Sequence, residues 1–179
     1  MQTLEAEDLR TFDLTQIIDG EEFVSPSPLS KHQGIVFKLS TIINTYIQNK
    51  KIGKVFISPL DVILEDGLNR LQPDLIFIHK NNKHILQDWI RGVPDMVCEV
   101  VSKNTLHMDT DKKKKIYQHY RVPEYWLVYP EYGTLEIYTI KDGEYDLYSS
   151  AIDEGIVRSK AIEGLEFDVR EIFEEDTWD

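Results

Sequence analysis

Two short apolar stretches that carry acidic side chains constrain the fold of this chain most. Residues 72–78 (QPDLIFI) and 94–102 (PDMVCEVVS) have the branched and aromatic composition of short buried strands, bounded by proline and polar residues. A carboxylate inside a sheet is costly unless it binds a cation or accepts hydrogen bonds. A lysine run, Lys112 to Lys115, follows these stretches. Acids on adjacent strands with a lysine close behind predict a site for a hard metal ion, suited to phosphodiester hydrolysis.

The length of the chain, 179 residues with 41% hydrophobic content, suits one buried core and is too short for two ordinary domains. We expect a polar, poorly ordered segment over 1–13 and a single domain over 14–179. Cys98 is the one cysteine, which excludes a disulfide framework or a cysteine zinc site. No basic, apolar leader and no apolar run of roughly 20 residues is present, so we expect a cytoplasmic protein.

The formal net charge of −12 argues against broad, nonspecific binding to nucleic acid, which usually requires a basic surface. The charge does not exclude a nuclease, because clustered carboxylates lose effective charge when divalent cations bind to them.

Periodicity predicts an α/β (α+β) fold, a mixed sheet flanked by helices. Ser30-x-x-Gln33 has the form of a capping box and is expected to open a core-facing helix that ends near 49–53. The other expected elements are a hairpin over 14–24, strands at 54–58, 60–65, 72–79, 95–101, 124–129, 134–140 and 145–149, a polar loop over 80–92, a helix over 107–120 and a short helix at 168–173.

The spacing of the acids indicates which of them act together. Asp95 and Glu99 share one face of a strand, but four residues of strand span roughly 13 Å, too far for one metal ion. Glu99 therefore needs a partner from a neighbouring strand about 4.8 Å away, and Asp74 is the natural candidate. Asp95, directly after Pro94, is expected to serve the turn.

The lysines of the run differ in the side of the expected helix on which they lie. The apolar face of the second expected helix is defined by Ile116, Tyr117 and Tyr120. Lys113 falls near the centre of that face and Asp109, four residues earlier, shares it. Lys114 is expected on the opposite side and Lys115 on the flank, both as solvated residues. A lysine alone on an apolar face favours function, because its compact charge can orient water and offset phosphate charge.

Two further residues have open interpretations. Glu22 follows the first hairpin turn and could supply a third acid beside the metal, or be a plain exposed glutamate. His32 opens the long helix and could contact phosphate or water, or be only a polar residue at a helix start. No Gly-rich phosphate loop, His-Glu-x-x-His or Gly-x-Ser-x-Gly motif is present.

Taken together, these segments resemble the Uma family of restriction-endonuclease-like proteins, a branch of the PD-(D/E)XK nuclease superfamily. The matching segments are IDGE at 18–21, SPSP at 25–28, HQ at 32–33, QPD at 72–74, GVPDMVCEVVS at 92–102, Asp109 with Lys113 and Tyr117, and VPEYWLV at 122–128. The resemblance implies a restriction-endonuclease-like fold, metal ligands at Asp74 and Glu99, and a catalytic lysine displaced from the strand position of Val101 onto a helix, at Lys113. The family's usual Ser-Pro-Ser-Thr is here Ser-Lys-Asn-Thr, which makes Lys103 a rival for that lysine.

The leading hypothesis is an endonuclease that hydrolyses DNA with Mg²⁺ or Mn²⁺. In this hypothesis Asp74 and Glu99 hold the cation, the cation polarises the phosphate and lowers the pKa of a bound water, and Lys113 positions that water. The alternatives are an inactive binding or assembly module with the same fold, and a hydrolase of small phosphorylated molecules. A homodimer is expected by analogy, with an apolar surface formed by Trp126, Tyr138, Tyr145 and Tyr148.

Overall fold

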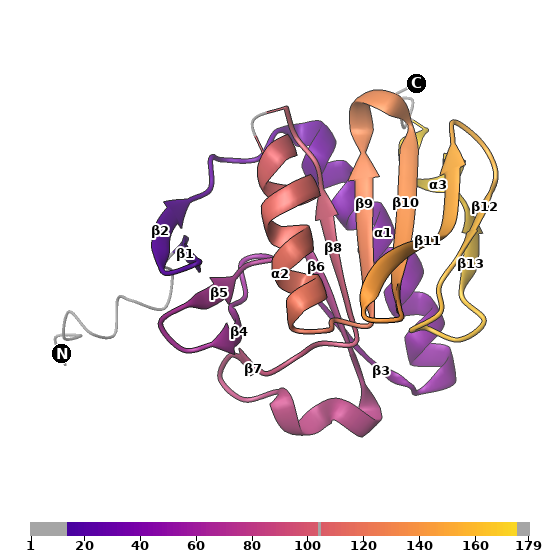
Figure 1. The fold of residues 1–179 in the computed structure, drawn as a ribbon. Helices are drawn as coiled ribbons and strands as arrows, with labels where there is room; N and C mark the ends of the chain where they lie inside the picture. Colours follow the sequence, from indigo (N-terminus) through magenta and orange to yellow (C-terminus); the bar gives the residue numbers. More distant parts are fainter. Residues whose placement is uncertain (1–13, 104, 175–179) are drawn as a thin grey trace, which may run out of the picture.

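The fold is built on a six-stranded mixed sheet (Figure 1). The computed structural model describes residues 14–103 and 105–174, so the segment 1–13 lies outside the described residues. The strands of this sheet, in spatial order, are β11 (Glu144–Ile152), β10 (Thr134–Lys141), β9 (Glu124–Tyr129), β8 (Met96–Val100), β6 (Leu75–His79) and β3 (Gly53–Ile57). β8 and β9 are parallel and the other neighbours are antiparallel.

Two smaller sheets flank the large one. One of them has the order β2 (Glu21–Val24), β1 (Thr15–Ile18), β5 (Asn69–Leu71), β4 (Val62–Glu65) and β7 (Ile90–Arg91). The other pairs β12 (Ile156–Arg158) with β13 (Glu166–Asp168). A 3₁₀ turn at Lys80–Ile85 joins β6 to β7, and another at Pro130–Tyr132 joins β9 to β10.

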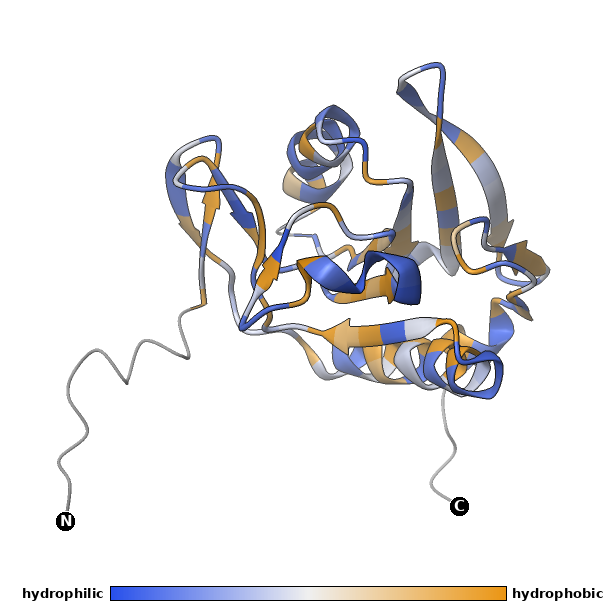
Figure 2. Cartoon of the chain, turned by 90° about the horizontal axis from the view of Figure 1, so that it is seen from below, coloured by the Kyte–Doolittle hydropathy of each residue, from blue (hydrophilic) through white to orange (hydrophobic). Residues whose placement is uncertain are grey.

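Helices pack on both faces of the large sheet, as Figure 1 shows. α1 (Ser30–Lys50) buries Ile35, Leu39 and Ile43 against one face. On the other face α2 (Lys114–His119) contributes Ile116 and Tyr117 to a second core. α3 (Arg170–Phe173) lies beside α1. The central strands are therefore buried on both sides and are largely hydrophobic in Figure 2.

The layers confirm the expected mixed sheet with flanking helices, and most of the expected elements are present. The capping-box expectation was wrong: Leu29 is the N-cap, Ser30 is already helical, and no side chain caps the helix. The segment over 80–92 is not a plain loop, since it contains a 3₁₀ turn and β7. Strands β5, β12 and β13 were not expected, because runs of three residues are too short to show a period.

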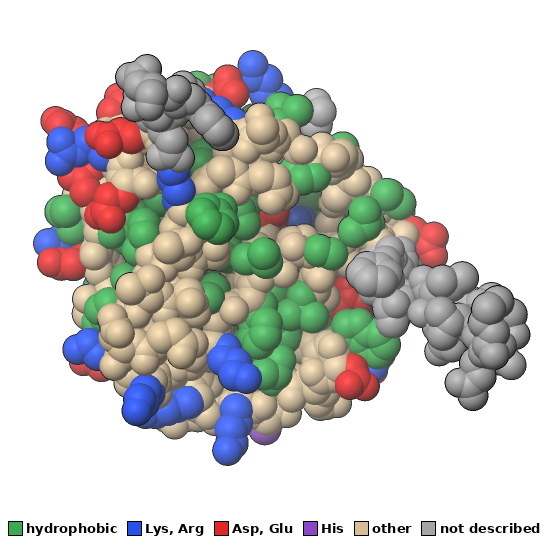
Figure 3. All heavy atoms as spheres, turned by 180° about the vertical axis from the view of Figure 1, so that it is seen from behind, with side chains coloured by type: hydrophobic (Ala, Val, Ile, Leu, Met, Phe, Trp, Pro, Cys, Tyr) green, Lys and Arg blue, Asp and Glu red, His purple; other side chains and the backbone are tan. Residues whose placement is uncertain are grey.

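No helix in the described part of the chain is long and apolar enough to cross a membrane. The positive charges are unevenly spread. Five exposed lysines, none of them in an ion pair with a described residue, lie around the ends of α1 and β6 and the start of β3: Lys50, Lys51, Lys54, Lys80 and Lys83. Blue side chains gather along the corresponding lower edge in Figure 3. This end of β6 is opposite to the end at which Asp74 lies.

Candidate active site

Adjacent strands bring Asp74 and Glu99 together. β6 and β8 pair with Leu75 opposite Cys98, and continuing this register by one residue places Asp74 opposite Glu99. Side chains opposite each other on an antiparallel pair have Cβ atoms about 5 Å apart. Leu75 and Cys98 belong to the core under α1, so their neighbours Asp74 and Glu99 face the α2 side. The register thus agrees with the predicted carboxylate pair.

Lys113 reaches this pair from a π-helical turn at Met108–Lys113 that leads into α2. Its Nζ lies 3.0 Å from Glu99 Oε1 and 3.3 Å from Asp109 Oδ1, and its side chain is only 6% exposed. Single π-turns inside helices occur frequently at functional sites. The ammonium group is therefore buried between two carboxylates, on the face where helical phase predicted it.

Hydrogen bonds fix one oxygen of each strand carboxylate. Asp74 Oδ2 accepts from the backbone N–H of Val100 at 2.7 Å and lies 3.2 Å from His32 Nε2. Glu99 Oε1 accepts from the Tyr117 hydroxyl at 2.9 Å, in addition to its contact with Lys113. Helix α1 thus orients one acid through His32, and α2 orients the other.

The charges in this cluster shift the pKa values of its members. Burial raises the pKa of Glu99 to about 8, and Asp109 and Asp74 add to that rise, while the Lys113 charge opposes it. Burial and the charge of Asp74 likewise raise the pKa of Asp109, although Lys113 opposes the shift. Burial alone would lower the pKa of Lys113, but the carboxylates Glu99 and Asp109 outweigh it and raise this pKa. Lys113 therefore stays protonated.

His32 responds to Asp74 in a similar way. Burial would lower the pKa of the imidazole, but the hydrogen bond to Asp74 and its charge outweigh this and raise the pKa. The other ring nitrogen, Nδ1, is buried and has no hydrogen-bond partner among the described residues.

The donor set fits a hard divalent cation held by two carboxylates. The second oxygens, Asp74 Oδ1 and Glu99 Oε2, have no hydrogen-bond partner within the described residues, and neither is a fully buried atom. No group of three or more His, Cys, Asp or Glu side chains in the described ranges is arranged to hold a metal ion. Two carboxylates are nevertheless sufficient for Mg²⁺, which usually keeps several waters and adds substrate phosphate.

Known proteins resemble this chain in sequence and in fold. Residues 3–170 match the model of the Uma2 family, described as "Putative restriction endonuclease". The chain belongs to the Uma2 family. It is also similar to a crystal structure described as a "putative nuclease belonging to DUF820" from Anabaena variabilis, with a TM-score of 0.74, 18% identity and 89% of each chain covered. At that identity the likeness concerns the fold. No curated protein matches the chain.

Three residues considered from the sequence lie outside the cluster of this Uma2 protein. Lys103, the rival lysine, is 82% exposed and pairs with Glu131 at 3.5 Å. Glu22 is exposed on β2 and makes no hydrogen bond or ion pair with a described acid or base of the cluster. Asp95 accepts hydrogen bonds from the backbone N–H of His79 at 2.7 Å and from Asn82 Nδ2 at 3.2 Å, which agrees with a role in the turn.

Two predictions of exposed residues, one in the late strands and one in the lysine run, were wrong. Trp126 is fully buried in the core under α1, so it cannot belong to an exposed apolar surface. Lys114 was expected in solvent, but its Nζ lies 3.3 Å from the centroid of the Tyr138 ring, because β10 runs beside the helix. Lys115 is exposed and pairs with Asp111, as a solvated residue does.

The sequence did not reveal that the hydroxyl groups of two tyrosines make hydrogen bonds in the site. Tyr117 and Tyr125 both have aromatic rings in the core, yet the Tyr117 hydroxyl binds Glu99 and the Tyr125 hydroxyl donates to the backbone oxygen of Asp109 at 2.9 Å. A buried tyrosine hydroxyl needs a partner, and Tyr117 follows Lys113 by one helical turn. That spacing was the available signal for Tyr117.

Proposed function

We propose that this Uma2 protein is a metal-dependent endonuclease that hydrolyses DNA phosphodiester bonds. One observation carries the proposal: a buried ammonium, Lys113, lies between Glu99 and Asp109 beside a second strand carboxylate, Asp74. A purely structural ion pair would balance one acid against one base. Here Lys113 contacts two acids, Glu99 and Asp109, while a third, Asp74, lies opposite Glu99 and bonds to His32. Three carboxyl groups gathered in one place favour a divalent cation at a pH at which they are ionised.

The chain's own residues have distinct roles in this proposal. Asp74 and Glu99 would hold Mg²⁺ or Mn²⁺ through their second oxygens, and the bound cation would stabilise the negative charge of the phosphate. The Val100 N–H, His32 and Tyr117 keep the two carboxylates in place.

Lys113 acts in this proposal as a fixed positive charge. Its raised pKa favours the protonated form near neutral pH, so the proposal gives it no role as a general base. It can orient an attacking water by donating hydrogen bonds, and it offsets charge on the phosphate. Asp109, one helical turn away, holds the ammonium from its other side.

DNA is the proposed substrate because the Uma2 family is described as "Putative restriction endonuclease", and restriction endonucleases act on DNA. The net charge of −12 favours a second candidate, a binding or assembly module with the same fold and no turnover. A homodimer also belongs to the proposal, since cutting both strands of a duplex requires two sites.

A cleavage panel tests this function. Supercoiled, linear and single-stranded DNA are incubated with Mg²⁺ or Mn²⁺, and nicking is followed on gels. We expect cleavage by the wild type, none by Glu99→Gln, and wild-type cleavage by Glu144→Gln, which changes an exposed glutamate of β11. Cleavage by Glu99→Gln would refute the assigned role of Glu99. No cleavage of any DNA by the wild type would favour the binding module.

A further inference from the structure

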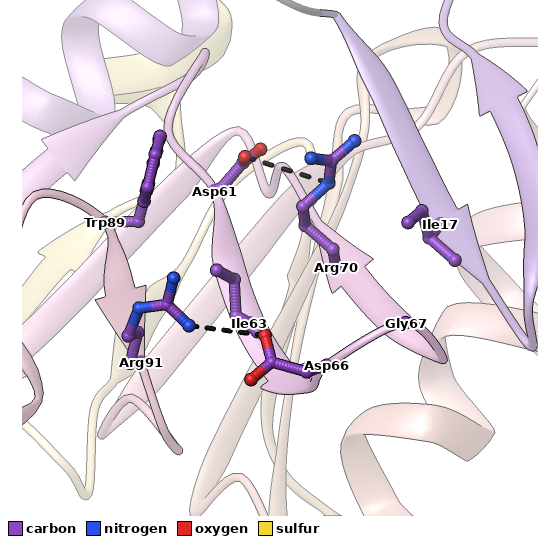
Figure 4. A pocket seen from close by; sticks show the side chains of 8 residues that line it. All are labelled: Ile17, Asp61, Ile63, Asp66, Gly67, Arg70, Trp89 and Arg91. Atoms are coloured by element: carbon purple, nitrogen blue, oxygen red, sulfur yellow. Dashed lines mark hydrogen bonds and ion pairs between the residues drawn. The ribbon is translucent and has the colours of Figure 1, made fainter. Parts of the chain in front are cut away.

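A concave site, separate from the carboxylate cluster, lies on the five-stranded sheet. It has a volume of about 190 Å³ and is formed by β1, β4, β5, β7 and the segments next to them. Figure 4 shows Trp89 on one side and Ile17 on the opposite side, with two Asp–Arg pairs between them. Arg70 Nε lies 3.8 Å from Asp61 Oδ2, and Arg91 Nη1 lies 3.2 Å from Asp66 Oδ1. None of these residues belongs to the cluster around Lys113.

The pocket is physically connected to Asp74. Gln72, two residues before Asp74, donates from Nε2 to Asp61 Oδ1 at 2.8 Å. The Ser58 N–H donates to the backbone oxygen of Asp74 at 3.1 Å, so the segment that leads to Asp61 passes alongside Asp74. Two residues of chain span at most about 7 Å. A DNA strand that continues from Asp74 along the Gln72 side chain would reach the pocket at its Asp61 end.

The lining chemistry selects the kind of ligand. Each arginine already faces a carboxylate. A phosphate group could therefore bind the arginines only by coming close to two aspartates, whose negative charge would repel it. A nucleobase has both acceptor atoms, which suit arginine, and amino donors, which suit aspartate. The Arg91–Asp66 ion pair is largely exposed and contributes little to the stability of the fold. Arg91 can therefore leave Asp66 and bind a ligand at a small cost in free energy.

Shape points to the same ligand class. Trp89 is 41% exposed although its ring borders the pocket, and the Arg91 guanidinium lies 5.8 Å from the ring centroid. Exposed aromatic rings stack bases with an energy of about 1–3 kcal/mol per base. The volume is below the roughly 300 Å³ at which pockets for drug-sized ligands begin, so it has room for one heterocycle rather than a whole nucleotide.

We propose that this pocket receives one unstacked nucleobase of the DNA strand bound at Asp74, stacked on Trp89 with its polar edge between Arg91 and Asp61. The inference rests on the proposed function, because it names how the same DNA would be held beside the cleavage site.

Binding in EDTA tests the pocket without requiring cleavage. The probes are a fluorescein-labelled single-stranded oligodeoxynucleotide, the same backbone with every base removed, and free deoxynucleoside monophosphates. Anisotropy gives Kd for the two oligomers, and competition gives it for the monophosphates. The variant is Trp89→Ala, and the matched control is Phe37→Ala, which removes an exposed aromatic ring from α1.

We expect Trp89→Ala to weaken binding of the intact oligomer roughly tenfold or more, with no change for the abasic oligomer. Phe37→Ala should match the wild type on both. Equal effects of Trp89→Ala on both oligomers, no effect on either, or no binding by the wild type would each overturn the inference. If the free monophosphates compete as well as the oligomer, the ligand of the pocket is a free nucleotide and not DNA, which would overturn the inference. Absence of cleavage with base-dependent binding intact would refute only the proposed function.

Discussion

Replacing Glu99 by glutamine should change how the stability of the metal-free protein depends on pH. Burial raises the pKa of Glu99 from 4.5 to about 8 in the folded chain. A raised carboxyl pKa means that the folded state holds its proton more tightly than the unfolded state. The contribution to stability is therefore complete below about pH 4.5 and is lost as the pH rises through about 8.

The size of the effect follows from this shift. Between about pH 6 and pH 8 the unfolded carboxyl is ionised, whereas the folded carboxyl is still largely protonated. Each pH unit then removes up to about 1.4 kcal/mol, and the gradient halves near the folded pKa. The wild type should thus lose about 2 kcal/mol of unfolding free energy across this interval through Glu99, and Glu99→Gln should lose none by this route.

Urea unfolding in EDTA, followed by circular dichroism at about pH 6 and pH 8, measures this difference. The change with pH within each protein is the readout, because Glu99→Gln also removes a carboxylate partner from Lys113 and so has a different baseline. His32 contributes equally to both proteins. An equal loss of stability in the wild type and in Glu99→Gln would refute the buried, raised-pKa description of Glu99.

Other substitutions have separate consequences. Lys113→Ala should lower the unfolding free energy by about 3–5 kcal/mol near pH 8, measured by urea unfolding, because it leaves buried carboxylates without their cation. Glu124→Ala should cost about 3 kcal/mol or more in the same assay, since this buried carboxylate accepts hydrogen bonds from Trp126, Ser159, Lys160 and Ala161; Glu144→Ala is the exposed control. Asp95→Ala should lose about 1–2 kcal/mol but keep DNA cleavage, and loss of cleavage with stability intact would contradict its turn role.

The sequence predicted the parts of the site that follow from period and spacing. Strand periodicity placed Glu99 on one face and required a partner from the next strand, and the register of β6 with β8 agrees with Asp74. Helical phase placed Lys113 and Asp109 on the inward face, where they meet. Both inferences need only local geometry, which is why they could be made from the chain alone.

Features that depend on tertiary contacts could not be predicted in this way. His32 had two open interpretations because its partner, Asp74, is 42 residues away along the chain. The sequence left Lys103 as a rival for the catalytic lysine, because its exposure and its pairing with Glu131 depend on the folded chain. The pocket beside Trp89 is formed by several short strands, so its residues show no common pattern in the sequence.

Calorimetric titration with Mn²⁺ at about pH 8 tests the central claim most directly, because the Asp74 and Glu99 carboxylates are proposed to hold one cation together. We predict one Mn²⁺ site in the wild type, weakened at least tenfold in both Asp74→Asn and Glu99→Gln. Identical Mn²⁺ affinity in the wild type and the two variants, or no binding by the wild type, would contradict the account.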